Sequence, residues 1–184
     1  NDLSAVYGGT PAGVQASWGN VVPNFVSGNT AMIVHTSGSL ASVLSQADFK
    51  VGVMGVPGKK SGSYSVPGGG NVYMLTGLTE AQEKAAFDVA VFLTEAERAA
   101  DFSINTGYIA TRKSSFDTAA MKAYASDNPQ VLETKDILAS AGKELALQNL
   151  GEVRSIFHNY IQAAFNGEMT PADAMAKAQA DADA

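Results

Sequence analysis

Small hydroxyl side chains gather in one stretch, Thr36-Ser37-Gly38-Ser39, between a short apolar run at 31–35 and a helix predicted from Leu40 to Gln46. A strand that delivers hydroxyl groups to the start of a helix suits an anion or a polar oxygen of a bound molecule. Alternatively, Ser37 or Ser39 caps the helix and does nothing else. The residue types allow both interpretations.

A run of three glycines, Gly68-Gly69-Gly70, follows Pro67 and precedes an apolar segment at 72–75. Glycine lacks a Cβ atom, so such a run lets bare backbone take positive φ and approach another surface closely. The run is interpreted either as a flexible turn before a strand or as a backbone wall against a ligand.

Two further polar side chains stand at helix ends. Tyr108 follows Gly107, a residue suited to the left-handed helix stop, and its phenol either points outward or hydrogen-bonds a bound polar molecule. Arg154 falls in the first turn of a helix predicted from Leu150 to Phe165, where a cation opposes the helix dipole. A bound anion or a surface salt bridge, for example with Glu152, would compensate.

Motifs for covalent chemistry are weak. The sequence contains no G-x-S-x-G, no P-loop and no H-E-x-x-H. A small α/β hydrolase acting through Ser37 with His35 or His158 is the enzyme alternative, but the spacing does not support it. Since there are no cysteines and only two histidines, we expect no metal centre. We also expect no cofactor and, because the catalytic motifs are weak, no enzymatic activity.

Composition narrows the class of protein. The chain has 184 residues, of which 46% are hydrophobic and 16% charged, which is ordinary for a globular protein. Its formal net charge of −6 argues against nucleic acid as a partner. Since no apolar run approaches the roughly 20 residues that cross a bilayer, no membrane span is expected. The first residues, 1–7, look like the middle of a protein, so we expect processing or truncation there.

The elements that must position these groups alternate between helices and short strands. Apolar runs predict strands at 31–35, 49–56 and 71–75. Capping and periodicity predict helices at 11–28, 40–46, 80–102 with a break near 94–95, 116–125, 130–141, 150–165 and 172–182. In the first of these, Trp18 is expected in the core. The pattern is α/β with a helical C-terminal half.

The order of these segments resembles a known family. The segments are F-V-S-G-N-T, A-M-I-V-H-T-S-G-S-L, F-K-V-G-V-M-G-V-P, the P-G-G-G strand, F-L-T-E-A-E-R-A-A, N-T-G-Y-I-A-T-R, L-G-E-V-R-S-I-F and F-N-G-E-M-T-P-A-D-A-M. Together they are similar to the C-terminal part of an extracellular solute-binding protein of ABC importers, in the carbohydrate-binding group (family 1). Within that group they look most like the proteins for glycerol 3-phosphate and glycerophosphodiesters.

The resemblance implies a periplasmic-binding-protein-like fold, in which two α/β lobes joined by a hinge close over a ligand. Residues 1–184 would form one lobe with hinge or crossing segments, and the N-terminal half would be missing. We therefore expect weak or no binding by this chain alone. Exposed strand edges would favour a dimer or a domain swap.

The resemblance also implies a function and a set of site residues. The protein would capture a small polar solute and deliver it to a membrane permease, at a periplasmic or extracellular location and membrane-associated through the transporter. Matching positions are Ser37 as a hydroxyl donor, Gly69 or Gly70 through backbone N–H, Tyr108 through its phenol and Arg154 as a donor to phosphate. Binding of a neutral mono- or oligosaccharide is the alternative within the family.

Overall fold

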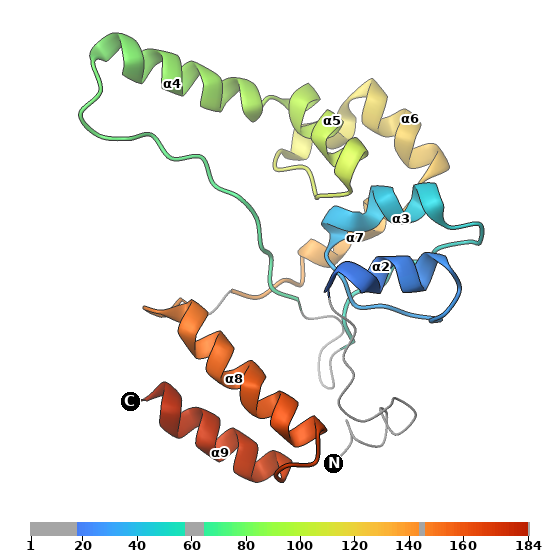
Figure 1. The fold of residues 1–184 in the computed structure, drawn as a ribbon. Coiled ribbons are helices and arrows are strands. Elements are labelled where there is room, and N and C mark those ends of the chain that lie inside the picture. The colour runs from blue at the N-terminus through green and yellow to red at the C-terminus, as the bar shows by residue number, and fades with distance from the viewer. Residues whose placement is uncertain (1–17, 58–64, 144–145, 184) are drawn as a thin grey trace. The chain divides into compact units, whose positions relative to one another are not determined.

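The computed structural model describes residues 18–57, 65–143 and 146–183. The chain divides into two compact units, each described below by itself. The central unit comprises residues 19–144, and the C-terminal unit comprises residues 145–184 together with residues 1–18. Figure 1 shows the helices of both units along the chain.

The central unit is built from helices and 3-10 turns. Its elements, in chain order, are α2 (Trp18–Val26), η1 (Ser37–Ser39), α3 (Leu40–Gln46), α4 (Glu80–Leu93), α5 (Ala96–Thr106), η2 (Lys113–Asp117), α6 (Ala119–Asp127) and α7 (Gln130–Leu138). The first of them, α2, begins at the boundary between the units.

The core of the central unit lies where α5, α6 and α7 meet. Ala100, Met121 and Val131 are almost completely buried there, and Phe116 and Tyr124 pack against them. Helix α3 adds Leu40 and Val43 to the buried set. Figure 1 shows α3, α5 and α6 gathered together. Since the T-S-G-S run leads directly into α3, this core fixes the position of that run.

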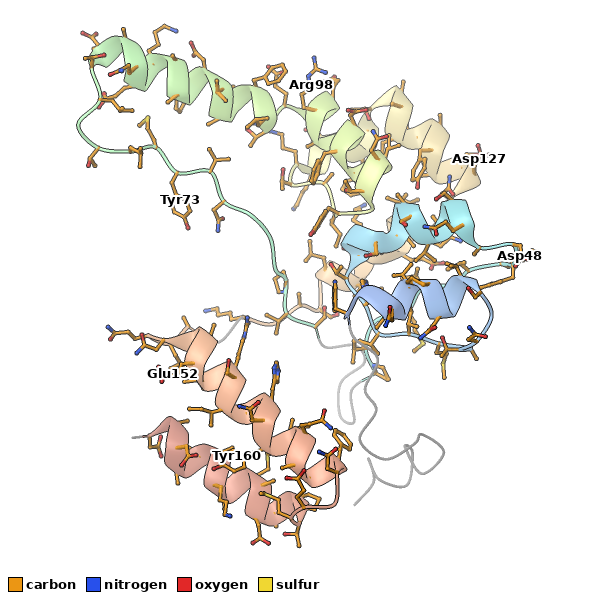
Figure 2. The ribbon with its side chains drawn as sticks, viewed as in Figure 1. Asp48, Tyr73, Arg98, Asp127, Glu152 and Tyr160 are labelled. Atoms are coloured by element: carbon orange, nitrogen blue, oxygen red, sulfur yellow. The ribbon has the colours of Figure 1, made fainter. Side chains whose placement is uncertain are left out.

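Helix α4 begins with the predicted capping box. The Thr79 side chain accepts from the backbone N–H of Gln82, and the Gln82 side chain accepts from the backbone N–H of Thr79. The helix contains no buried residue. It breaks at Thr94 as predicted, and the Arg98 guanidinium spans the break by lying 4.7 Å from the centroid of the Phe92 ring. Figure 2 labels Arg98 beside this joint.

Most helix predictions are confirmed, with changes at the boundaries. Helix α5 continues to Thr106 rather than Phe102. The helix predicted from Phe116 to Ala125 is split, because Thr118 caps a new helix, α6, by accepting from the Met121 backbone N–H. The predicted start at Thr10-Pro11 lies outside the described residues. Trp18 is 66% exposed, so its placement in the core was wrong.

The three predicted strands are extended segments without strand partners. Across the described ranges there is an isolated bridge residue at Pro57 and no strand ladder. The predicted strands are therefore not formed within the described ranges, and the α/β class is confirmed only in its helical part. A strand needs hydrogen bonds from a neighbouring strand, whereas the Val51 carbonyl accepts from the Gln130 side chain at 2.7 Å. Tyr73, labelled in Figure 2, is accordingly 79% exposed.

The C-terminal unit contains a helical hairpin formed by α8 (Leu150–Phe165) and α9 (Pro171–Ala182), both as predicted. Thr170 caps α9 by accepting from the Asp173 backbone N–H. Ala174 and Ala178 of α9 are buried, and such small side chains let two helices approach closely. No helix in the described part of the chain is both long and apolar enough to cross a bilayer.

Candidate functional site

Ser37 opens the 3-10 turn η1, directly before α3. Thr36 caps this turn by accepting from the Gly38 backbone N–H at 3.2 Å, and Ser39 makes no capping hydrogen bond through its side chain. The interpretation that Ser37 or Ser39 caps the helix is therefore wrong. Among the described residues, no hydrogen bond engages the Ser37 hydroxyl.

Tyr108 follows the left-handed stop of α5. Gly107 has φ +93° and its N–H donates to the Ser103 carbonyl, which confirms the predicted helix stop. The Tyr108 N–H donates to the Thr106 hydroxyl at 3.1 Å. Its ring stacks on Phe102 with centroids 5.7 Å apart, and the residue is 41% exposed. Within the described ranges the phenol hydroxyl has no hydrogen-bond partner.

The structure brings the segments that carry Ser37 and Tyr108 together. A Cβ atom added to Gly107 would lie 2.5 Å from the Ser37 carbonyl oxygen, and one added to Gly38 would lie 2.6 Å from the Tyr108 ring. Two segments far apart in the sequence are thus in direct contact. The result is a partly exposed surface that carries two hydroxyl groups, which we call the hydroxyl pair (Ser37 and Tyr108).

Gly69 and Gly70 lie in an extended, exposed segment of the same unit. No atom lies within 4 Å of a Cβ built on either residue, and neither has positive φ. The expected positive φ is therefore absent, and the space that a side chain would occupy at either position is open. Gly70 lines a hollow of about 390 Å³ together with side chains of α4, including Phe87 and Val91.

Arg154 belongs to the C-terminal unit, where it is an exposed residue of α8. It is the fifth residue of α8, after the Asn149 cap, and so lies just beyond the first turn in which it was predicted. His158, expected to be partly buried, is exposed, and its ring centroid lies 6.2 Å from that of Phe157. The arginine is therefore accessible from solvent on the surface of the hairpin.

A second hollow of the central unit, of about 520 Å³, lies between α3, α5 and α6. Its lining includes Ser42, Asn105 and Tyr124 but none of the predicted site residues. Burial raises the pKa of the Tyr124 phenol, so this group is neutral at physiological pH. No cluster of metal-ligating side chains occurs among the described residues.

The chain belongs to the family of bacterial extracellular solute-binding proteins, whose model matches residues 4–130. It is similar to the sn-glycerol-3-phosphate-binding periplasmic protein UgpB of Pectobacterium atrosepticum, with 25% identity over 160 residues. The UgpB of Escherichia coli K12 is 26% identical over 162 residues. Each match covers 82% of this chain and 36% of the relative. The chain thus spans about a third of the length of these curated relatives.

A solved structure has a similar fold. The crystal structure of UgpB from Mycobacterium tuberculosis in complex with glycerophosphocholine matches with a TM-score of 0.70 and 22% identity. The match covers 89% of this chain and 42% of that chain. The described helices therefore follow the periplasmic-binding-protein fold.

Three residues near the hydroxyl pair were not singled out as site residues from the sequence. Phe102 was assigned only to a helix, Gly107 only to a helix stop, and Gly38 only to the T-S-G-S run. The sequence did show a glycine next to Ser37 (Gly38) and a glycine next to Tyr108 (Gly107), and this was the signal available. It could not reveal the partner of each glycine, because those contacts join distant segments.

Proposed function

We propose that this chain is part of the solute-binding component of an ABC importer and binds a small polar solute without chemical change. The observation that carries the proposal is the hydroxyl pair: the segments of Ser37 and Tyr108 are in contact through Gly38 and Gly107, and no described residue engages either hydroxyl. Unsatisfied hydroxyls on a partly exposed surface can exchange water for the oxygens of a solute. Membership of the solute-binding family supports this role.

Glycerol 3-phosphate or a glycerophosphodiester is the proposed solute class. Relatives with 25% and 26% identity are named for glycerol 3-phosphate. In this proposal Ser37 and Tyr108 bind the polar oxygens, Gly69 or Gly70 donates a backbone N–H, and Arg154 donates to the phosphate. A guanidinium suits phosphate because its fork matches two oxygens and it stays charged. A neutral mono- or oligosaccharide is the alternative solute.

The site would be completed by further polypeptide of a solute-binding protein. We propose that residues 1–184 form the C-terminal part of a two-lobe α/β protein, in which the extended segments 31–35, 49–56 and 71–75 pair as strands. Their exposed apolar side chains, such as Val34 at 77% and Leu75 at 74%, support this pairing. Unpaired, the same segments would favour a dimer or a domain swap of the chain by itself.

The cellular setting follows from the same proposal. A solute-binding component works in the periplasm or outside the cell and reaches the membrane through its permease partner. The relatives are named periplasmic proteins, which supports this location. Nucleic acid is not a proposed partner, because the chain carries a net charge of −6.

Removing the arginine tests the phosphate assignment. NMR titration of the 184-residue chain with glycerol 3-phosphate, glycerophosphocholine and maltose detects weak binding that an incomplete cleft would leave. We expect both phosphorylated probes to shift Ser37 and Tyr108 resonances, and Arg154→Ala to remove this binding while the fold persists. Arg98→Ala, which removes another helical arginine, is the matched control.

Three outcomes would redirect the proposal. Unchanged affinity in Arg154→Ala would contradict the phosphate role of that residue. Binding of maltose with none of glycerol 3-phosphate would favour the neutral-sugar alternative. Hydrolysis of p-nitrophenyl acetate that disappears in Ser37→Ala would favour the hydrolase alternative, and we expect no such activity.

A further inference from the structure

Gly107 holds two chain segments together at the hydroxyl pair. Its φ of +93° lies in the left-handed region that side chains rarely adopt, and the residue is buried. An added Cβ would lie 2.5 Å from the Ser37 carbonyl oxygen, 2.7 Å from the Leu40 Cβ and 2.9 Å from the Leu40 backbone nitrogen. Backbone conformation and close packing therefore both require glycine here.

Gly38 lies against the aromatic ring of the pair. A Cβ on Gly38 would lie 2.6 Å from both Cε2 and Cζ of Tyr108 and 2.9 Å from Cε1. Three neighbouring ring atoms at such similar distances place that Cβ position over the face of the ring, near its hydroxyl end. Any side chain at position 38 would therefore push the phenol away from its present position.

Phe102 supports the same ring from within α5. The two rings are nearly parallel, at 16°, with centroids 5.7 Å apart, an offset stack that aromatic pairs favour. In the described part of the chain, neither the Ser37 hydroxyl nor the Tyr108 hydroxyl is held by a hydrogen bond. Packing at Gly38, Phe102 and Gly107 thus determines where the Ser37 backbone and the Tyr108 ring lie, and with them the two groups.

We propose that Gly38, Phe102 and Gly107 are positioning residues, which hold the hydroxyl pair in one geometry for a solute. The proposal rests on the proposed function, since it concerns the same two hydroxyls. It extends that function by assigning roles to residues that touch no solute themselves. A fixed geometry lowers the conformational entropy lost when the solute binds.

A double-mutant cycle tests the packing without any ligand. Gly38→Ala should lower the urea midpoint of unfolding when Tyr108 is present and have little effect in Tyr108→Ala, since the ring is then absent. Gly52→Ala is the matched control, because no atom lies within 4 Å of a Cβ at that extended position. Additive effects of Gly38→Ala and Tyr108→Ala would overturn the contact between these positions.

Ligand titration tests the positioning role. At a temperature where each variant is folded, Gly38→Ala and Gly107→Ala should weaken binding of glycerol 3-phosphate at least tenfold, whereas Gly52→Ala should not. Tyr108→Phe retains the ring, so it should keep the coupling with Gly38 and lose affinity only through the missing hydroxyl.

The two proposals can fail separately. If the wild-type chain binds neither glycerol 3-phosphate nor glycerophosphocholine nor maltose, solute binding by residues 1–184 themselves and the positioning role are both contradicted, while coupling would still establish the packing. If the wild-type chain binds and Gly38→Ala binds equally well despite the coupling, the proposed function stands and the positioning role is overturned.

Discussion

The buried side chain of Met121 should contribute strongly to the stability of the central unit. Its side chain is completely buried between α5, α6 and α7, so truncation would leave a cavity. Met121→Ala should lower the free energy of unfolding by about 2–5 kcal/mol. Urea unfolding followed by circular dichroism measures the change.

Met54→Ala is the matched control for this substitution. Met54 is 72% exposed in an extended segment of the same unit, so the same atoms are removed without a cavity. We expect a change within about 0.5 kcal/mol. A loss as large as that of Met121→Ala would contradict the packing described for α6.

At the residue scale, the sequence identified chemical groups but not their neighbours. The types of Ser37 and Tyr108 were sufficient to mark them as possible ligand contacts. Their proximity depends on how the end of α5 packs on the start of α3, through Gly107 and Gly38, which no local pattern encodes. The same limit explains why Phe102, 57% exposed and stacked on Tyr108, was assigned only to a helix.

At the element scale, the α8–α9 hairpin contains a hydrogen bond that should respond to pH. The Tyr160 hydroxyl donates to the Asp181 carboxylate at 2.6 Å, and Figure 2 shows Tyr160 on α8, the helix paired with α9. This hydrogen bond, with desolvation and the negative charge of Asp181, raises the pKa of the Tyr160 phenol above its ordinary value of 10.0. The bond requires the neutral phenol.

Stability of the hairpin should therefore fall in alkali. The unfolded chain loses the Tyr160 proton at lower pH than the folded chain. The Tyr160–Asp181 hydrogen bond therefore contributes fully to the folding stability below pH 10.0, and this contribution is lost as the pH rises through the folded pKa. Between about pH 8 and about pH 11, the melting temperature should fall more for wild type than for Tyr160→Phe. Tyr73→Phe, at an exposed position, should behave as wild type. Equal falls in wild type and Tyr160→Phe would rule out this linkage.

Helices were predicted well and strands poorly, for a physical reason. The signals for α4 and α9 are local: Thr79 and Thr170 each satisfy a backbone N–H within one turn. A strand at 71–75 needs a partner from elsewhere, and its alternation of side chains says nothing about whether that partner is present. The sequence was thus sufficient to predict the helices, but it was not sufficient to predict whether the extended segments pair as strands.

At the scale of the whole molecule, the extended segments leave much apolar surface in contact with water. Met32 is 82% exposed, Tyr73 is 79% exposed and Leu75 is 74% exposed. Such exposure is unusual for large apolar side chains in a complete globular domain. Helix α4 adds Phe87 at 61%. This surface agrees with a chain that covers 36% of a curated relative and 42% of the solved structure whose fold it matches.

Tyr73 also makes the segment at 71–75 a substrate for proteases. An extended, exposed backbone fits a protease active site without prior unfolding, and chymotrypsin cleaves after aromatic residues. Limited digestion of the 184-residue chain should cut first after Tyr73, while Tyr124, in the partly buried face of α6, should resist. Mass spectrometry of the fragments identifies the site.

The rate of this cleavage then measures how far the segment is covered. If copies of the chain pair through 71–75, the fraction cut after Tyr73 per unit time should fall as the protein concentration rises at a fixed, low protease concentration. A rate independent of concentration would indicate that the segment stays open. Cleavage of the exposed backbone beside the glycine run therefore reports self-association of the chain without a label or a ligand.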